Sequence, residues 1–176
     1  VPLDQVPANV QTADAAQMRA LQSLNLPDFM GAQLPSVTIN HTQGNPYQMT
    51  LNYRGFSASP LLGLPQGLSV YLDGVRVNEP FGDVVSWDLI PKSAISSITL
   101  MPGSNPLYGL NTLGGALVLR SKSGDTDPGG EVEVQGGSFG RRSVDLSYGQ
   151  KVGEHGHVFG AFSGFDEDGW RDFSPS

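Results

Sequence analysis

The chain has 176 residues, enough to bury the core of at least one domain, and a net charge of −7. That acidic balance argues against a nucleic-acid partner, because contacts with phosphates need a basic face. The sequence contains no cysteine, which excludes disulfides, zinc–thiolate sites and a cysteine nucleophile. With 23 Gly and 13 Pro, it favours many short strands and loops over a helical bundle.

The first 34 residues predict an extended segment followed by two short helices. Thr12 or Asp14 is suited to cap the first helix, because a short polar side chain can accept a hydrogen bond from the first turn. One face of that helix would carry the apolar residues Ala15, Met18, Leu21 and Leu24. Pro27 suits the first turn of a second helix, which would continue through Phe29, Met30 and Leu34.

From residue 35 the hydrophobic period changes to two, as in β-strands. Alternating apolar residues predict strands near 37–39, 49–53, 68–77, 94–101 and 115–122. Asp73-Gly74 stands between two alternating runs and predicts a tight hairpin. Short helices followed by mixed short strands indicate a small α+β domain, which we place at residues 1–122.

The rest of the chain has a different pattern. Residues 123–130, SGDTDPGG, have the composition of a linker. Within 131–176, three alternating stretches follow, in which polar and apolar residues take opposite faces, as Glu133 and Val134 do. This pattern fits strands of a transmembrane β-barrel, and it also fits a solvent-facing antiparallel sheet with one buried side. Three strands are too few to close a barrel, which needs about eight.

Several short motifs suggest chemistry, but their contexts argue against it. Residues 136–140 match G-x-S-x-G, yet an alternating strand follows Ser138 where a hydrolase needs a helix, so a glycine turn is the better interpretation. The acidic run 166–172 lacks the ligand spacing of a calcium loop. His155 and His157 have no third ligand nearby. We therefore expect no enzyme activity, no metal site and no cofactor.

Five segments in chain order resemble the plug of a TonB-dependent outer-membrane receptor. They are VPANVQ (6–11), LNYRGF (51–56), VYLDGVRVN (70–78), IPKSAISSITLMPGSNPLYG (90–109) and LGGALVLRSK (113–122). The tail segments GGSFGRRSVDLSYG and GFDEDGWRDFSPS resemble the first barrel strands that follow such plugs. The resemblance implies a mixed short-stranded β-sheet with flanking short helices, followed by antiparallel strands from the start of an incomplete transmembrane β-barrel at 131–176.

The resemblance also implies a function, namely an active transporter and receptor in the bacterial outer membrane whose plug reaches the periplasm. Its partners would be TonB with the inner-membrane energising complex, outer-membrane lipid, and an extracellular small solute such as a metal chelate. A ferric siderophore, and hence iron transport, is the commonest case in such receptors, while cobalamin and carbohydrates stay open. The TonB box is not evident, and the absence of an initial Met or a signal peptide leads us to expect a mature chain or a fragment. The alternative is a free-standing soluble ligand-binding module with no membrane role.

The family pattern implies that loops 41–45, 57–67 and 79–87 form the outward apex of the plug. The solute-binding candidates in these loops are Thr42, Gln43, Asn45, Ser57, Ser59, Phe81, Asp83 and Trp87. Phe81 and Trp87 would equally suit packing against the interior of the barrel. The resemblance assigns Arg54 a contact between plug and barrel. Because Ser96-Ser97 and Pro102-Gly103-Ser104 replace charged motifs of the family, we expect few ionic contacts at that interface.

Turn-forming residues complete the predicted set. The structural turns are assigned to Asp73, Gly74, Gly103, Gly109, Gly114 and Gly115. In plugs of this family the glycine-rich segment winds through the barrel interior, and glycine permits both close backbone approach and positive φ angles. The strand that follows, 116–120, would then lie in the central sheet of the plug.

Overall fold

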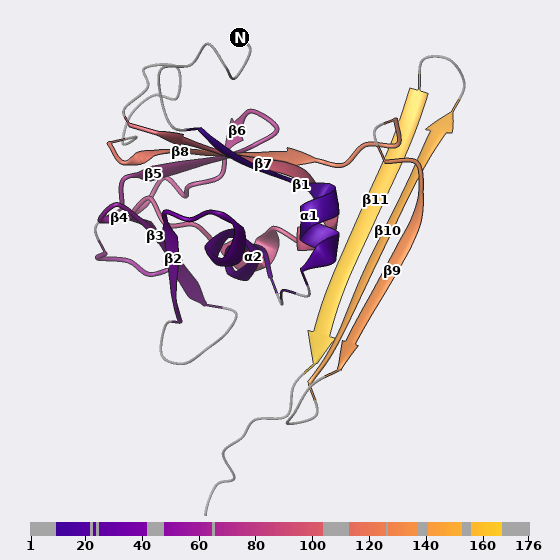
Figure 1. The fold of residues 1–176 in the computed structure, drawn as a ribbon, viewed down its shortest axis with the longest axis horizontal. Helices are drawn as coiled ribbons and strands as arrows, with labels where there is room; N and C mark the ends of the chain where they lie inside the picture. Colours follow the sequence, from indigo (N-terminus) through magenta and orange to yellow (C-terminus); the bar gives the residue numbers. More distant parts are fainter. Residues whose placement is uncertain are drawn as a thin grey trace, which may run out of the picture. The chain divides into compact units, whose positions relative to one another are not determined.

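The computed structural model describes residues 10–21, 23, 25–41, 48–64, 66–103, 113–125, 127–136, 141–152 and 156–166. The chain divides into two compact units, Val1–Ser121 (unit 1) and Lys122–Ser176 (unit 2), which are described separately. Short helices and several small sheets make up the described residues, which confirms the predicted α+β class (Figure 1). No helix within these residues is long and apolar enough to cross a membrane.

Unit 1 contains two α-helices, two 3-10 helices and eight strands in its described residues. In chain order they are β1 (Gln11–Asp14), α1 (Ala15–Ala20), α2 (Leu26–Gln33), β2 (Val37–His41), β3 (Met49–Tyr53), β4 (Phe56–Ala58), β5 (Leu68–Leu72), β6 (Val75–Arg76), η3 (Trp87–Leu89), η4 (Lys92–Ala94), β7 (Ile95–Pro102) and β8 (Gly115–Ser121). The strands predicted from the alternating pattern are thus confirmed, although β6 is shorter than expected.

Local capping explains where the first helix begins. Asp14 ends β1 and caps α1, because its carboxylate accepts a hydrogen bond from the backbone N–H of Gln17 at 2.9 Å. The Gln17 side chain accepts the backbone N–H of Asp14 in return, which completes a capping box. The helix is shorter than predicted, since Leu21 is its C-cap and has an extended backbone.

The second helix is also capped by a polar side chain. Asn25 caps α2 by accepting the backbone N–H of Asp28 at 3.0 Å, and Pro27 lies in the first turn as predicted. Leu34 is the C-cap rather than a helical residue, so this helix also ends before the predicted position. Its residues Phe29 and Met30 are fully buried, which makes α2 the helix that contributes most to the core.

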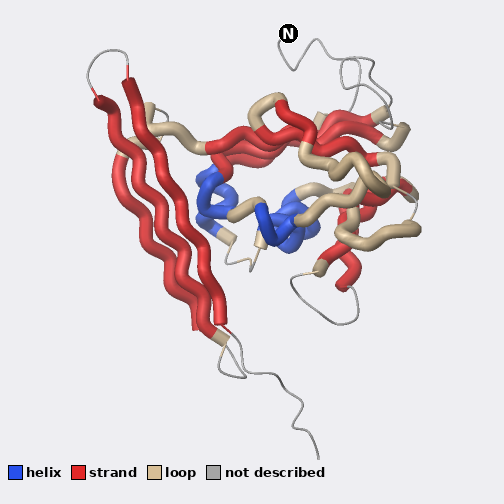
Figure 2. The backbone as a smooth tube through the Cα atoms, turned by 180° about the vertical axis from the view of Figure 1, so that it is seen from behind, coloured by secondary structure: helices blue, strands red, loops and turns tan. Residues whose placement is uncertain are grey.

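Two sheets make up the rest of unit 1. The five-stranded sheet has the order β1-β7-β8-β5-β6, in which only β5 and β8 are parallel neighbours. The second sheet is antiparallel with the order β2-β3-β4. Figures 1 and 2 show α1 and α2 on the same side of the five-stranded sheet. β8 is the central strand of that sheet, which confirms the position expected for 116–120.

The core of unit 1 lies between the helices and the two sheets. Its fully buried side chains include Leu26, Phe29, Met30, Leu51, Leu68, Val70, Ile98, Leu100, Leu117 and Leu119. The core residues alternate along β5, at Leu68 and Val70, and along β8, at Leu117 and Leu119, as the period of two requires. The Asp73-Gly74 hairpin between β5 and β6 is confirmed, and φ angles of 50° and 83° give both turn residues the left-handed backbone that such turns need.

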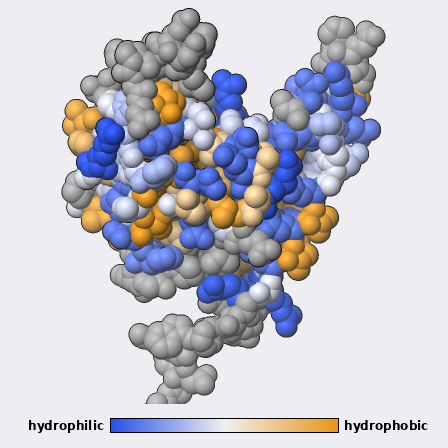
Figure 3. Space-filling model, in the orientation of Figure 1, coloured by the Kyte–Doolittle hydropathy of each residue, from blue (hydrophilic) through white to orange (hydrophobic). Residues whose placement is uncertain are grey.

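Unit 2 is a three-stranded antiparallel sheet with the order β11-β10-β9. Its strands are β9 (Gly129–Gly136), β10 (Arg142–Val152) and β11 (Gly156–Asp166). Val134 pairs with Val144, and Leu146 pairs with Phe162, so these apolar side chains share one face. Glu133 pairs with Asp145 on the opposite, polar face. The predicted alternation is confirmed, and Figure 3 shows hydrophobic side chains gathered over β9.

The residues before β9 pack against the strands of unit 2. The Lys122 ammonium lies 3.0 Å from the Glu131 carboxylate, and its side chain is 6% exposed. A Cβ atom at Gly124 would overlap the carbonyl oxygens of Gln150 and Val158, so the backbone at residue 124 touches β10 and β11. The predicted division into 1–122, 123–130 and 131–176 stays a prediction. The close packing at Gly124 holds part of 123–130 against β10 and β11.

Candidate functional site

The candidate site consists of two loops of unit 1 that meet near the start of β5. Loop A (57–67) begins in β4 and leads into β5, whereas loop B (79–87) connects β6 to η3. Both contain residues predicted to bind a solute. Among the described residues no three His, Asp or Glu side chains lie close enough together to hold a metal ion.

Ser59 organises loop A from inside the protein. Its side chain is fully buried, and its hydroxyl lies 2.8 Å from the Thr50 hydroxyl on β3. The same hydroxyl accepts the backbone N–H of Leu61 at 3.1 Å. Gln66 closes the loop, because its amide oxygen accepts the Ser59 backbone N–H at 3.2 Å and its amide nitrogen donates to the Leu61 carbonyl at 3.3 Å. Loop A is thus folded around its own polar groups.

Asn78 performs the corresponding role for loop B. Its side-chain oxygen accepts the backbone N–H of Val70 at 2.7 Å, and its amide nitrogen donates to the Leu68 carbonyl at 3.0 Å. The nitrogen also donates to the Asp83 carbonyl at 3.3 Å. Because Asn78 is buried, these bonds are shielded from water. The side chain thereby extends the hydrogen bonding of β5 beyond the short strand β6.

Two hydrogen bonds join the loops to each other. The backbone N–H of Val85 in loop B donates to the Ser59 carbonyl in loop A at 2.8 Å. The indole N–H of Trp87 donates to the Ala58 carbonyl at 3.2 Å, and the Trp87 side chain lies in the core of unit 1. These two hydrogen bonds hold the ends of loops A and B next to each other.

The charged residues of loop B are hydrogen-bonded to residues nearby in the sequence. Arg76 and Asp83 form an ion pair with a nitrogen–oxygen distance of 2.7 Å, and Asp83 has a left-handed φ of 57°. The Glu79 backbone N–H donates to the Val84 carbonyl at 2.8 Å, and the Glu79 carboxylate accepts the Ser86 hydroxyl at 2.9 Å. Loop A contains no charged residue. The exposed charge on the two loops is therefore mainly the Glu79 carboxylate.

Large apolar side chains reach the surface on the same two loops. Phe81 is 78% exposed, Leu62 is 58% exposed and Leu64 is 39% exposed. Gly82 has a φ of 75°, and a Cβ atom there would overlap the Leu62 side chain, so loop A touches the Phe81-Gly82 turn of loop B. We call Leu62, Leu64 and Phe81 the apolar patch.

The structure places the predicted solute-binding residues in different environments. Ser57, Ser59 and Trp87 are buried, Asp83 is half-buried and Phe81 is exposed. The candidates that lie outside the described residues are Thr42, Gln43 and Asn45. A solute-binding role for these eight residues stays a prediction, and of the described candidates Phe81 is the most accessible to a solute.

Sequence reasoning missed three residues that shape the site, namely Leu62, Gln66 and Asn78. The signal for Leu62 was present in the run LLGLP, because turn formation alone does not explain three leucines among Gly and Pro. Nothing in the local sequence marks Gln66 or Asn78, since Gln66 finds its partners when loop A folds back on itself and Asn78 when the chain returns to β5.

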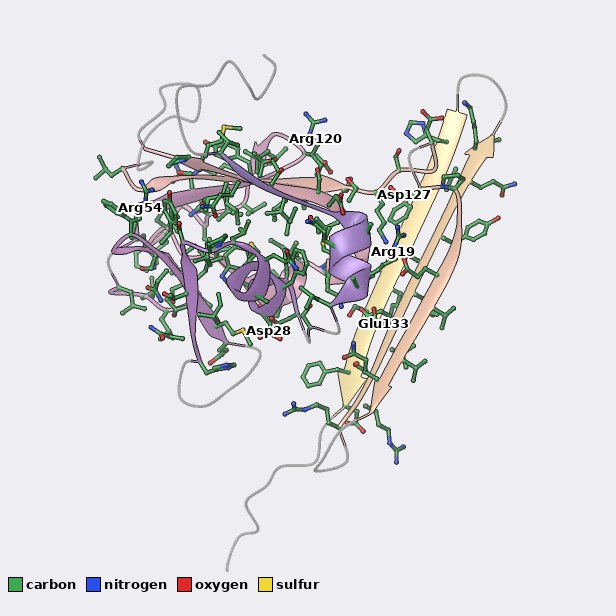
Figure 4. All side chains as sticks on the ribbon, viewed as in Figure 1. Arg19, Asp28, Arg54, Arg120, Asp127 and Glu133 are labelled. Carbon is green, nitrogen blue, oxygen red and sulfur yellow. The ribbon has the colours of Figure 1, made fainter. Side chains whose placement is uncertain are left out.

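Arg54 lies at the turn of the β3–β4 hairpin (Figure 4). It has a φ of 49°, and Gly55 follows with a φ of 83°, so this pair forms the same kind of turn as Asp73-Gly74. The guanidinium lies 5.2 Å from the centre of the Tyr53 ring, within range of a cation–π contact. The side chain is exposed, and its contact with a barrel stays a prediction.

Two of the predicted turn residues show why the chain is rich in glycine where β8 begins. The Gly114 backbone N–H donates to the Gly67 carbonyl at 3.0 Å, and a side chain at Gly114 would overlap the Phe56 ring. Gly115 has a φ of 149°, and a Cβ atom there would lie 2.5 Å from the Met101 carbonyl oxygen. Gly109 lies outside the described residues. Close packing within unit 1 therefore accounts for Gly114 and Gly115.

Asp73 and Ser96 have structural partners at the other end of the central strands. The Asp73 carboxylate accepts the Ser121 backbone N–H at 2.9 Å, which ties the β5–β6 hairpin to the end of β8. The Ser96 hydroxyl lies 3.1 Å from the carbonyls of both Arg120 and Ser121, at the irregularity in the pairing of β7 with β8. The expected scarcity of ionic contacts with a barrel stays a prediction.

The chain is similar to known proteins over most of its length. The family model described as TonB-dependent Receptor Plug Domain matches residues 2–116. The vitamin B12 transporter BtuB of Vibrio vulnificus (strain CMCP6) is 24% identical over 167 residues, which are 94% of this chain and 26% of the relative. BtuB of Vibrio cholerae is 24% identical over 86% of this chain and 24% of the relative. The chain thus spans about a quarter of the length of these curated relatives.

Solved structures share the fold of the chain. The siderophore receptor PiuA from Acinetobacter baumannii matches 96% of this chain and 22% of its own, with a TM-score of 0.71 and 20% identity. The ferric yersiniabactin uptake receptor FyuA from Yersinia pestis matches 91% of this chain and 24% of its own, with a TM-score of 0.61 and 19% identity. At these identities the likeness concerns the fold, and it includes plug and barrel strands.

Proposed function

The chain belongs to the TonB-dependent receptor plug domain family, and from this we propose that it is the plug and barrel start of an active outer-membrane transporter. This family consists of receptors and transporters that take up small solutes such as siderophores or vitamin B12. We infer that the parent protein binds a scarce solute from outside the cell and gates its entry into the periplasm.

One observation carries the proposal more than any other. The plug fold of unit 1 runs directly into three paired strands that expose an apolar face, with Val132 and Val134 exposed by 68% and 70%. A soluble sheet would bury such a face, whereas a barrel strand turns it toward lipid. The polar face of the same strands would then line the interior of the barrel, as the residues Glu131, Glu133 and Asp145 suit.

The proposed mechanism needs a switch that responds to solute. A wide barrel would be an open pore, so the plug has to occlude it. Solute binding at loops A and B would favour a state in which the N-terminal segment is accessible to TonB, which would pair with it by strand addition. TonB would transmit energy from the inner membrane, because the outer membrane maintains no ion gradient of its own. The plug would therefore face the periplasm on its N-terminal side.

We propose a ferric siderophore as the first class of solute to test and a corrinoid as the second. The siderophore receptors that share the fold support the first class, and the vitamin B12 transporters that share sequence support the second. The free-standing soluble module is not favoured, because the plug family and its relatives are parts of outer-membrane proteins. A hydrolase using Ser138 has no support from the family.

The test is uptake by cells that express the full reading frame. Cells lacking their own receptors for each solute would be given iron-55 chelates or cobalt-57 cyanocobalamin, with and without functional TonB. We expect uptake of at least one solute only when TonB is present, and we expect the protein in the outer-membrane fraction. A protein found in the soluble fraction, or uptake that is equal without TonB, would contradict the proposed function.

A further inference from the structure

The segment between β8 and β9 is folded onto the strands of unit 2. We call it the clasp (122–127, which the structure describes except for residue 126). The backbone N–H of Asp127 donates to the Ser123 carbonyl at 2.8 Å, which closes the clasp on itself. The first residues of the predicted linker therefore form a closed turn.

Two glycines let the clasp lie directly on the strands of unit 2. A Cβ atom at Gly149 on β10 would lie 2.4 Å from the Asp127 carbonyl oxygen and 3.3 Å from the Gly124 Cα atom. A Cβ atom at Gly124 would lie 2.4 Å from the carbonyl oxygens of Gln150 on β10 and Val158 on β11. A side chain at either glycine would collide with the opposite backbone, so the clasp lies across β10 and β11 because both positions lack one.

A partly buried ion pair fixes the start of the clasp. The Lys122 ammonium lies 3.0 Å from a Glu131 carboxylate oxygen on β9, and the side chains are 6% and 36% exposed. The Lys151–Asp125 pair has the same distance, but its side chains are 59% and 56% exposed. Because water screens a buried pair less than an exposed one, the pair at Lys122 holds more strongly. The clasp is therefore held by charge at its first residue and by backbone packing farther along.

Consecutive residues are fixed to different units at the start of the clasp. The Ser121 backbone N–H donates to the Asp73 carboxylate in unit 1 at 2.9 Å, whereas Lys122 pairs with Glu131 in unit 2. The two units are therefore joined at the peptide bond between Ser121 and Lys122. A force applied to unit 1 from its N-terminal side reaches unit 2 through this bond.

The clasp determines how such a force would load the strands. Without it, a pull at residue 121 would act on the first residue pairs of β9, which could separate from β10 one after another. Because the clasp lies across β10 and β11, the pull acts instead on two strands that pair over 11 residues, Arg142–Val152 with Gly156–Asp166. Many hydrogen bonds then share the load, so the strands resist a larger force than pairs that open in turn.

We propose that the clasp is a mechanical stop, which stays on β10 and β11 when unit 1 is pulled open during transport. The part of the chain that moves would then end at Ser121, and the strands of unit 2 would keep their pairing. The inference rests on the proposed function, because it assumes that TonB pulls on the N-terminal side of unit 1. The competing account is a passive linker, which would come away from the strands together with unit 1.

The experiment pulls the full-length parent protein, held in a lipid bilayer, by atomic force microscopy from a handle at residue 1. The main variant is Gly149→Ala, whose methyl group takes the space of the Asp127 carbonyl and lifts the clasp without altering it. The matched control is Gly160→Ala, because Gly160 lies in β11 and a Cβ atom there meets none of the described atoms within 4 Å. Lys122→Met is a second variant that keeps both glycines. Heat-modifiable mobility in gels checks that each variant forms a folded barrel.

We expect the unfolding of unit 1 to end when residues 1–121 are extended, at a length of about 440 Å for about 3.6 Å per residue. A separate force peak should follow, and its rupture should release residues 122–128 in a further step of about 25 Å. In Gly149→Ala this peak should be lost, so that the preceding stage is longer by about 25 Å. Lys122→Met should lower the force of the peak and keep its position, and Gly160→Ala should match the wild type.

The passive linker predicts a different record. A wild-type stage that runs past residue 121 without a separate peak, or equal records for Gly149→Ala and Gly160→Ala, would overturn the inference. If Gly149→Ala does not fold, Lys122→Met decides the question, and an unchanged force peak in that variant would contradict the inference.

The uptake assay separates failure of the inference from failure of the proposed function. If uptake depends on TonB while the wild-type record has no separate peak, the proposed function stands and only the inference fails. If uptake does not depend on TonB, the proposed function fails and the inference fails with it, whatever the pulling record shows.

Discussion

Asn78 shows how a single side chain can complete a sheet. Its amide replaces hydrogen bonds that the two-residue strand β6 is too short to provide to β5. We predict that Asn78→Ala lowers the free energy of unfolding of the chain by about 2–4 kcal/mol, because it leaves buried backbone groups without partners. Urea unfolding would measure the loss. Asn52→Ala is the control, since Asn52 makes only a 3.5 Å bond to Thr50, and an equal loss in both variants would contradict the prediction.

Gly103 and Gly115 illustrate two different reasons why a position can require glycine. Both have positive φ angles, 82° and 149°, but of the two only Gly115 has, among the described residues, a neighbour in the space of a Cβ atom. We predict that Gly103→Ala destabilises unit 1 by about 1–2 kcal/mol from backbone strain alone. Gly115→Ala should cost clearly more, because the Met101 carbonyl has to move. Thermal unfolding of the two variants compares them, and an equal shift would show that crowding at residue 115 has no effect.

Asp125 gives a pH dependence with a definite sign. The Lys151 ammonium, by its hydrogen bond and its charge, lowers the pKa of the exposed Asp125 carboxyl. A carboxyl whose pKa is lowered in the folded state stabilises that state at neutral pH. This stabilisation is lost as the pH falls below about 4. We predict that Lys151→Gln raises the pKa of Asp125 in a carbon-13 NMR titration. An unchanged titration midpoint would show that the ion pair does not form in solution.

At the scale of elements, β9 offers a test of which face meets lipid. Val134 lies on the apolar face and the adjacent Gln135 on the polar face of the three-stranded sheet. We predict that Val134→Lys in the parent protein reduces insertion into the outer membrane, because a lysine on the lipid face costs up to about 2–4 kcal/mol near the midplane. Gln135→Lys is the matched control and should insert normally. Insertion is measured by heat-modifiable mobility in gels, and equal yields would argue against the barrel interpretation.

Elements defined by local pattern were predictable, whereas those defined by distant partners were not. Asp73-Gly74 marks its hairpin in the sequence, and the alternation of 131–166 gives both faces of unit 2. The helices were predicted too long, because Leu21 and Leu34 fit the apolar pattern but end each helix in an extended conformation. A pattern of apolar residues reports which side is buried and does not report where the backbone turns.

The site was harder to predict than the fold for a physical reason. Ser59 is a small polar residue of the kind usually found in exposed loops, yet its contacts with Thr50 and Gln66 bury it. Such contacts depend on how the chain folds back over seven to nine residues, which the pattern of apolar residues does not encode. Phe81 was named because the family pattern places loop 79–87 at the outward apex of the plug, while Leu62 of the partner loop was overlooked.

At the scale of the whole molecule, the edges of unit 2 govern how this chain behaves alone. β9 and β11 are the outer strands of their sheet, so each has one side without a strand partner among the described residues. Such edges promote pairing with another copy. We predict that the 176-residue chain self-associates in a concentration-dependent way in sedimentation analysis, and that its amides in 131–165 exchange quickly when it is monomeric. A stable monomer with strong exchange protection across 131–165 would contradict this.

The strand order of the five-stranded sheet also dictates the sequence of events during synthesis. β8 lies between β7 and β5, so these two strands cannot join one sheet until β8 has been synthesised as far as Ser121, and β1 has to wait for β7. Of the strand pairs in this sheet, β5 and β6 are the ones joined by a tight turn, at Asp73-Gly74. Domains dominated by such distant pairings close slowly and in a concerted manner. The five-stranded sheet of the nascent plug would therefore close only after residue 121 has been synthesised, and the strands made earlier would wait in an incomplete sheet.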